Sequence, residues 1–110
     1  MKAIKLIDSL QQRDELDIRV YAMVSNVPEY VEKYLDDGPY KTDRLNVSSF
    51  KVYADGALGS RGAVLKAPYS DKENHYGAMV IGVDKFKELA SRLANSPFQM
   101  NTHAIGDSAN

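Results

Sequence analysis

Hydrophobic and polar positions along the chain follow two periods, one typical of helices and one typical of strands. Apolar residues recur at helical spacing within residues 3–10, 30–35 and 86–94, which predicts three amphipathic helices. Residues 18–24, 47–54 and 98–103 are short runs rich in β-branched and aromatic residues, which predicts three strands. Residues 55–78 are rich in Gly, Pro, Asp and Asn and predict a long loop. Loops of that length inside compact domains are uncommon and often functional.

Capping residues set the expected ends of these elements. Asn26 is the expected cap of a helix with Pro28 in its first turn, and Gly38 is expected to end it. Asp84 is the expected cap of the next helix, and Asp107 of a further one that starts just before the sequence stops. The first helix has no capping residue before it. We therefore interpret residues 1–110 as a fragment with both ends truncated.

The order strand, helix, strand favours parallel strands joined by crossover helices. In the second strand, positions 50, 52 and 54 are apolar, whereas Lys51 and, just past the strand, Asp55 point to the other side. His103 lies on the polar side of the third strand. A polar second face fits the inside of a (β/α)₈ barrel near its catalytic mouth. A two-layer sheet with that face in water is the alternative. About three parallel strands are a partial barrel, because a complete one takes ~250 residues.

Composition narrows the classes of function. Hydrophobic residues make up 44% and charged residues 26%, as in ordinary globular chains. Lys and Arg total 14 against 15 for Asp and Glu, which argues against nucleic acid or an anionic membrane as the main partner. No apolar run approaches the ~20 residues that cross a bilayer. The chain has no Cys, so any metal must be held by His, carboxylate or a modified Lys.

Two stretches resemble a known family. Residues 51–63, KVYADGALGSRGA, precede Pro68-Tyr69-Ser70-Asp71, and residues 103–107 read HAIGD. Together they resemble the amidohydrolase superfamily and, within it, amidohydrolase family 3, which includes N-substituted formamide deformylases and AepA-like proteins. Order and spacing agree, and the resemblance extends from Arg19 onward. It implies a metal-dependent hydrolase on a distorted (β/α)₈ barrel, with this chain covering about the third to fifth strands of the catalytic domain.

The resemblance also implies two metal ligands. Lys51 occupies the position of the ligand on the fourth strand, where its amine would be carboxylated to a carbamate that binds divalent metal. His103 occupies the ligand position on the fifth strand, and imidazole is a suitable ligand for zinc. A lysine removed from water is more readily neutral, and its amine can then attack carbon dioxide. The implied metal is zinc in the intact parent, with an empty or weakly occupied site in this fragment.

Other residues carry two interpretations each. Asp55 and Gly56 lie beside the substrate in the family interpretation, and they make a simple turn in the alternative. Arg61 binds either an anionic group of the substrate or an internal carboxylate. Asp107 is first a helix cap and second a hydrogen-bonding partner near the imidazole ligand. His75 lies in a polar loop and is expected to be solvated.

The predicted function is hydrolysis of an amide-like carbon–nitrogen bond in a small-molecule substrate by the parent protein. The family's remaining ligands, a His-x-His pair, a second His and an Asp, are absent, so we expect the fragment alone to be inactive. Exposed strand edges predict a homo-oligomer. The cytoplasm is favoured, although an export signal would lie upstream of Met1.

Two alternatives remain open. One is a free-standing α+β binding module in which Lys51 and His103 are surface groups, and antiparallel strands would favour it. The other is a regulatory or assembly domain that leaves Lys51 unmodified.

Overall fold

A computed structural model describes residues 1–110 and contains three helices and four strands. In chain order they are α1 (Lys2–Gln12), β1 (Val20–Ser25), α2 (Pro28–Asp37), β2 (Tyr40–Lys41), β3 (Leu45–Tyr53), α3 (Val83–Ala94) and β4 (Gln99–His103). The three predicted helices and three predicted strands are confirmed, with ends that move by a few residues. The short strand β2 was not predicted. None of the helices is long and apolar enough to cross a membrane.

The chain forms two compact units. The first contains Met1–Lys51 and Leu93–Asn101, and the second contains Val52–Arg92 and Thr102–Asn110. The strands β3 and β4 pass from one unit into the other, so each unit holds part of both. The first unit carries most of the sheet, and the second carries the long loop and the ends of both strands.

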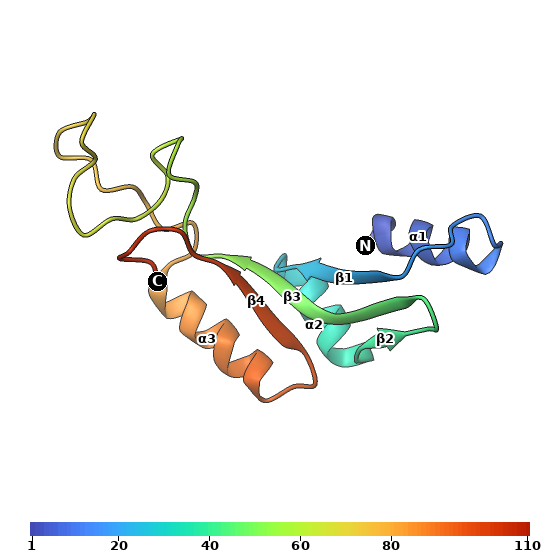
Figure 1. Ribbon diagram of the computed structural model, residues 1–110. Coiled ribbons are helices and arrows are strands. Elements are labelled where there is room, and N and C mark those ends of the chain that lie inside the picture. The colour runs from blue at the N-terminus through green and yellow to red at the C-terminus, as the bar shows by residue number, and fades with distance from the viewer. The chain divides into compact units, whose positions relative to one another are not determined.

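The sheet of the first unit is mixed. β1 pairs in parallel with β3, from Val20 opposite Leu45 to Ser25 opposite Lys51 (Figure 1). β2 pairs antiparallel with β3, and only two pairs of residues take part. The chain reverses between them through Thr42, whose hydroxyl accepts the Leu45 N–H at 3.1 Å. The fold is therefore mixed α/β, with parallel pairing of its longer strands as predicted and one short antiparallel arm. The partial barrel stays a prediction.

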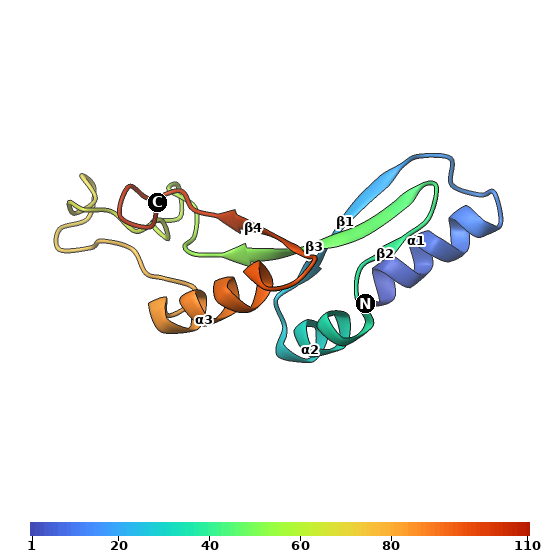
Figure 2. The ribbon, with the colours of Figure 1, turned by 90° about the horizontal axis from the view of Figure 1, so that it is seen from below.

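The apolar side of the strands forms the core. Val24 of β1 and Val47 and Phe50 of β3 are completely buried. The ring of Phe50 packs edge-on against Phe98, with ring centroids 5.0 Å apart. Helix α2 packs against β1 in the first unit, and its buried residues are Val31 and Tyr34 (Figure 2). The predicted alternation is thus confirmed from Phe50 to Ala54, whereas Val47 lies beyond a shift of the register against β1, between the pairs Ala22–Val47 and Met23–Ser49.

Two predicted helix starts were wrong by a residue or two. Helix α2 begins after Val27 rather than Asn26, and it has no side-chain cap because the side chain of Val27 carries no hydrogen-bond acceptor. Gly38 ends it with φ of 80°, as predicted. Helix α3 begins at Val83, which places Asp84 in its first turn instead of before it. A carboxylate there still stabilises the helix, because it lies near the positive end of the helix dipole.

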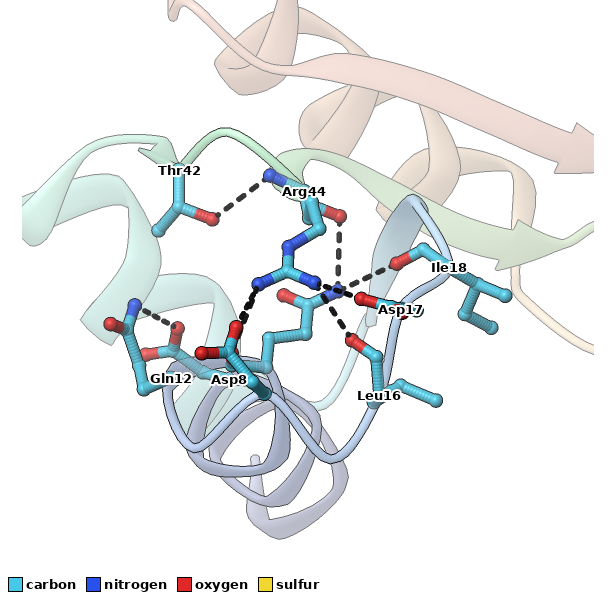
Figure 3. Close-up of polar contacts among 9 residues, drawn as sticks. Asp8, Gln12, Leu16, Asp17, Ile18, Thr42 and Arg44 are labelled. Carbon is cyan, nitrogen blue, oxygen red and sulfur yellow. Dashed lines mark hydrogen bonds and ion pairs between the residues drawn. The ribbon is translucent and has the colours of Figure 1, made fainter.

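Arg44 holds the chain between α1 and β1 in place. Its guanidinium donates to the carbonyl of Leu16 at 3.4 Å and to the carboxylate of Asp17 at 2.7 Å (Figure 3). It also donates to the carbonyl of Gln11 at 3.2 Å and pairs with Asp14, which adopts a left-handed φ of 56°. A planar fork with five donors suits this task, because one side chain satisfies several acceptors at once. Arg44 thereby fixes the turn that leads into β1.

Removal of the Phe50 ring tests the core. We expect Phe50→Ala to lower the free energy of unfolding by ~3–5 kcal/mol, because a completely buried ring leaves a cavity and its contact with Phe98 is lost. Urea denaturation followed by circular dichroism measures the change. The control is Leu6→Ala, at a side chain that is 58% exposed, with an expected change within ~0.5 kcal/mol. Equal losses in both variants would contradict the proposed core.

Candidate functional site

The second unit gathers the carboxyl ends of β3 and β4 around a long loop. Residues 55–82 between β3 and α3 contain no helix or strand, as predicted for 55–78 (Figure 1). Ala54, directly after β3, donates its N–H to the carbonyl of His103 at 2.9 Å. Val80 donates its N–H to the carbonyl of Ala54 at 2.8 Å. These bonds bring the end of the loop and the end of β4 to the same point of the chain.

The carboxylate of Asp55 is the centre of this arrangement. The side chain is completely buried. Its Oδ1 accepts the N–H of Ile105 at 2.9 Å, and its Oδ2 accepts the N–H groups of Val64 at 2.9 Å and Gly106 at 2.8 Å. A buried carboxylate is tolerable only when such donors replace the water it has lost. Asp55 thus ties the loop to the segment that follows β4.

These hydrogen bonds lower the pKa of Asp55. The N–H of Ile105 has the largest effect, those of Val64 and Gly106 add to it, and the nearby His103 contributes further. Burial opposes the change but does not outweigh the donors. Asp55 is therefore held as a carboxylate, and both of its oxygens are already bound to backbone. A direct contact of Asp55 with substrate stays a prediction, whereas its role in holding two loops together follows from the geometry.

Three glycines allow the backbones to approach. A Cβ on Gly106 would lie 1.9 Å from the carbonyl oxygen of Val64, and one on Gly56 would lie 3.1 Å from the Cα of Gly62. Gly56 also donates its N–H to the carbonyl of Gly62 at 3.0 Å. Glycine is needed at these positions because the two loop segments lie too close together for a side chain. For Gly56 the structure provides a packing reason, and contact with substrate stays a prediction.

His103 is the last residue of β4 and is half-buried. Its ring lies against the ring of Tyr53, with centroids 5.3 Å apart and planes at 46°. Two residues later, the N–H groups of Ile105 and Gly106 are bound by Asp55. The imidazole is therefore positioned from both sides, by an aromatic ring next to it and by the anchored backbone that follows it.

Lys51 belongs to the first unit and is half-buried on β3. It shares a side of the strand with Tyr53, two positions further along, because side chains alternate. An imidazole at a strand end fits a contribution to a metal centre, whereas a lysine amine needs conversion to a carbamate before it can serve. No group of three or more His, Cys, Asp or Glu side chains is placed to hold a metal ion. The two predicted ligands therefore do not complete a metal site in this chain, and their roles stay predictions.

Arg61 pairs with a carboxylate of its own loop. Its Nε and one terminal nitrogen donate to the two carboxylate oxygens of Asp71, at 3.2 and 2.9 Å. Asp71 raises the pKa of Arg61, and Arg61 lowers the pKa of Asp71. The alternative of an internal carboxylate is thus the observed contact, and a bond from Arg61 to substrate stays a prediction. Arg61 adopts a left-handed φ of 59°, which the ion pair helps to hold.

His75 is not simply solvated, contrary to the sequence-based expectation. Its Nε2 lies 2.9 Å from the carbonyl oxygen of Arg61, so this nitrogen carries the proton. Its ring packs against Tyr69, with centroids 5.5 Å apart, and the buried hydroxyl of Tyr69 donates to the carbonyl of Ala63 at 2.7 Å. His75 is half-buried because the loop folds back on itself. The sequence placed it among polar neighbours and gave no sign of this long-range contact.

Asp107 does not begin a helix within the chain. Residues 107–109 form a turn, and the Asp107 carboxylate accepts the N–H of Lys66 at 3.0 Å. The carboxylate is thus used by a distant loop, while Asn110 donates its N–H to the carbonyl of Gly106 at 3.0 Å. The role of Asp107 as a helix cap stays a prediction. Beside it, Ser108 donates its N–H to the carbonyl of Val64 at 3.1 Å. Asp107 and Asp55 therefore both join the long loop to the segment that follows β4.

The sequence analysis missed Tyr53 and Asp71 as members of this site. Tyr53 had a usable signal, since it lies between Lys51 and Asp55 on the polar side of the second strand. Asp71 had none, because a loop carboxylate ten positions from an arginine is indistinguishable from a solvated one.

Comparisons with known proteins agree with a hydrolase relationship. No protein-family model matches the chain. It is 36% identical over 81 residues to "Putative amidohydrolase YtcJ" of Bacillus subtilis (strain 168), covering 74% of this chain and 14% of that protein. It is 27% identical over 117 aligned positions to "Protein LONG AFTER FAR-RED 3" of Arabidopsis thaliana, covering 94% of this chain and 20% of that protein.

Solved structures give the same result. The chain matches an uncharacterized metal-dependent hydrolase from Pyrococcus horikoshii OT3 with 31% identity and a TM-score of 0.87, over 99% of this chain and 23% of the other. A metal-dependent hydrolase from Pyrococcus furiosus matches with 32% identity, the same TM-score and the same coverage. The chain therefore has an amidohydrolase-like relationship, and it spans less than a quarter of the length of these proteins. Membership of amidohydrolase family 3 stays a prediction.

Acid should release the Asp55 contacts. A lowered folded-state pKa means that Asp55 stabilises the folded protein fully above its unfolded-state pKa of about 3.9. This stabilisation disappears as the pH falls from there through the lower folded-state pKa. We expect wild type to exceed Asp55→Asn in melting temperature at pH 7, with the gap narrowing below pH ~4. Thermal unfolding measured across pH tests this, and a gap that stays constant would contradict it.

A methyl group at Gly106 should separate the segment after β4 from the loop backbone at Val64. We expect Gly106→Ala to destabilise the protein by at least ~1–3 kcal/mol, because its Cβ would strike a backbone carbonyl that cannot rotate away. The matched control is Gly59→Ala in the same unit, where a Cβ meets nothing within 4 Å and the expected change is within ~0.5 kcal/mol. Chemical denaturation compares the two. A Gly106→Ala protein as stable as the control would show that the two backbones are not in close contact.

Proposed function

We propose that this chain contributes to the catalytic domain of a longer metal-dependent hydrolase that cleaves an amide-like carbon–nitrogen bond. The main support is the match of 99% of the chain to part of a metal-dependent hydrolase at a TM-score of 0.87. A second support is local, since His103 ends a strand and its ring and following backbone are both held. Functional residues commonly lie at strand ends in α/β enzymes.

In this proposal His103 and Lys51 are two of the metal ligands, and the remaining ligands come from elsewhere in the longer protein. A divalent metal, with zinc favoured, would when bound polarise the carbonyl of the substrate and make a water molecule more acidic. The chain's own residues hold the imidazole in place and keep the loop of residues 55–82 closed onto the strand end. The chain alone, which lacks a group of three or more ligands, is expected to show no turnover and weak zinc affinity.

The proposal is tested on the longer protein with ligand variants. We expect His103→Ala and Lys51→Ala each to lower metal content and amide hydrolysis by more than ~100-fold, because loss of a ligand should exceed the effect of losing its supporting partner. Glu73→Gln, at an exposed loop carboxylate in the second unit, is the control and should keep both. Metal content is measured by mass spectrometry, and hydrolysis on a panel of N-substituted amides.

The state of Lys51 has its own readout. Protein incubated with ¹³C-bicarbonate and zinc should give a carbamate carbonyl signal that is absent from Lys51→Ala. Full activity after complete removal of metal would overturn the proposed function. Full activity of Lys51→Ala would overturn only the role of the lysine.

A further inference from the structure

The one buried carboxylate of the second unit is bound to backbone on both oxygens, and two of its three donors lie two and three positions after the predicted imidazole ligand. A simple turn residue does not need this arrangement. An Asp that only started a turn would bond to N–H groups within a few positions of itself. Asp55 instead reaches residues 50 and 51 positions away along the chain. The question is what these distant bonds hold.

We propose that Asp55 is a positioning residue for His103. Its carboxylate fixes Ile105 and Gly106, two and three positions after the imidazole. The carbonyl of His103 itself accepts the N–H of Ala54, the residue directly before Asp55. Two neighbouring residues after β3 thus hold the backbone from the His103 carbonyl to Gly106.

The third donor, the N–H of Val64, includes the long loop in the same set of contacts. Val64 gives its N–H to Asp55, and its carbonyl oxygen accepts the N–H of Ser108. The carbonyl lies where a Cβ on Gly106 would have to sit. The segment that follows His103 is therefore held between Asp55 on one side and the loop backbone on the other. The carboxylate charge matters because it makes each of the three bonds charge-assisted and so stronger than a neutral one.

The position that results for the imidazole is specific. With the backbone fixed, the His103 ring packs against Tyr53 at a centroid distance of 5.3 Å. A side chain whose neighbours are fixed loses less conformational freedom when it binds a ligand, so its affinity is higher. The relevance to metal binding rests on the proposed function. The positioning of His103 by Asp55 does not, and it is tested without metal.

The experiment uses NMR on the 110-residue chain with no metal added. In wild type we expect scalar couplings across the hydrogen bonds between the Asp55 carboxyl carbon and the amide nitrogens of Ile105, Gly106 and Val64. We also expect nuclear Overhauser effects between the rings of Tyr53 and His103. Absence of both signals from the folded wild-type chain would overturn the proposal, and this measurement needs no variant to fold.

The variant is Asp55→Asn, which keeps the shape but replaces an accepting oxygen by an NH₂ donor facing another donor. We expect hydrogen-exchange protection of the Ile105, Gly106 and Val64 amides to fall by at least ~10-fold and the Tyr53–His103 effects to weaken. Protection of amides in α3, in the same unit through Arg92, should change much less. The control, Glu73→Gln, removes an exposed carboxylate in the same unit and should change none of these signals.

The outcomes separate positioning from general stability. Unchanged protection and unchanged ring contacts in Asp55→Asn would overturn the proposal. An equal loss of protection in α3 would also overturn it, since Asp55 would then support the whole unit and not His103 in particular. Failure of the metal experiments on the longer protein, with these signals as expected, would reject the proposed function and leave the positioning role standing.

Discussion

Backbone N–H groups from two separate loops converge on the carboxylate of Asp55, and the second unit depends on that convergence. A buried charge is costly unless donors replace its water, so the carboxylate and the loops require each other. Without the charge, Val64 and Gly106 would present buried N–H groups with no acceptor. Without the loops, Asp55 would have to face solvent. The glycine at position 106 belongs to the same constraint, because the loop backbone occupies the place of any side chain there.

The strands place His103 and Asp55 at their carboxyl ends. Parallel pairing of β1 and β3 buries one side of each strand, and Phe50 with Phe98 fills the core on that side. Alternation then leaves the other side for Lys51 and Tyr53, and it carries the chain into Asp55 at the strand end. Arg44 secures the opposite end of the same strand by binding the turn before β1. One strand thus runs from the segment held by Arg44 to the residues that lead into Asp55.

The relationship to metal-dependent hydrolases connects this arrangement to the proposed function. The matched proteins are several times longer, and the chain spans 23% of the solved examples. In the proposed function, this chain supplies two of the ligands, an imidazole at the end of β4 and a lysine on the polar side of β3. In that proposal Asp55 and Tyr53 support His103 without binding a metal, Asp55 through the backbone that follows it and Tyr53 through the ring contact.

The sequence alone determined three helices, three of the four strands, the apolar side of the second half of β3, and the hydrolase resemblance carried by the KVYADG and HAIGD stretches. These follow from local periodicity and from short motifs, which need no knowledge of distant contacts. It gave no sign of the bonds from Asp55 to the loop and to the segment after β4, of Asp71 as the carboxylate that pairs with Arg61, or of the contact of His75 with Tyr69. Each of those depends on residues 6 to 51 positions away being brought together. Only the tertiary structure decides them, because a hydrogen bond over that separation forms only after the chain has folded.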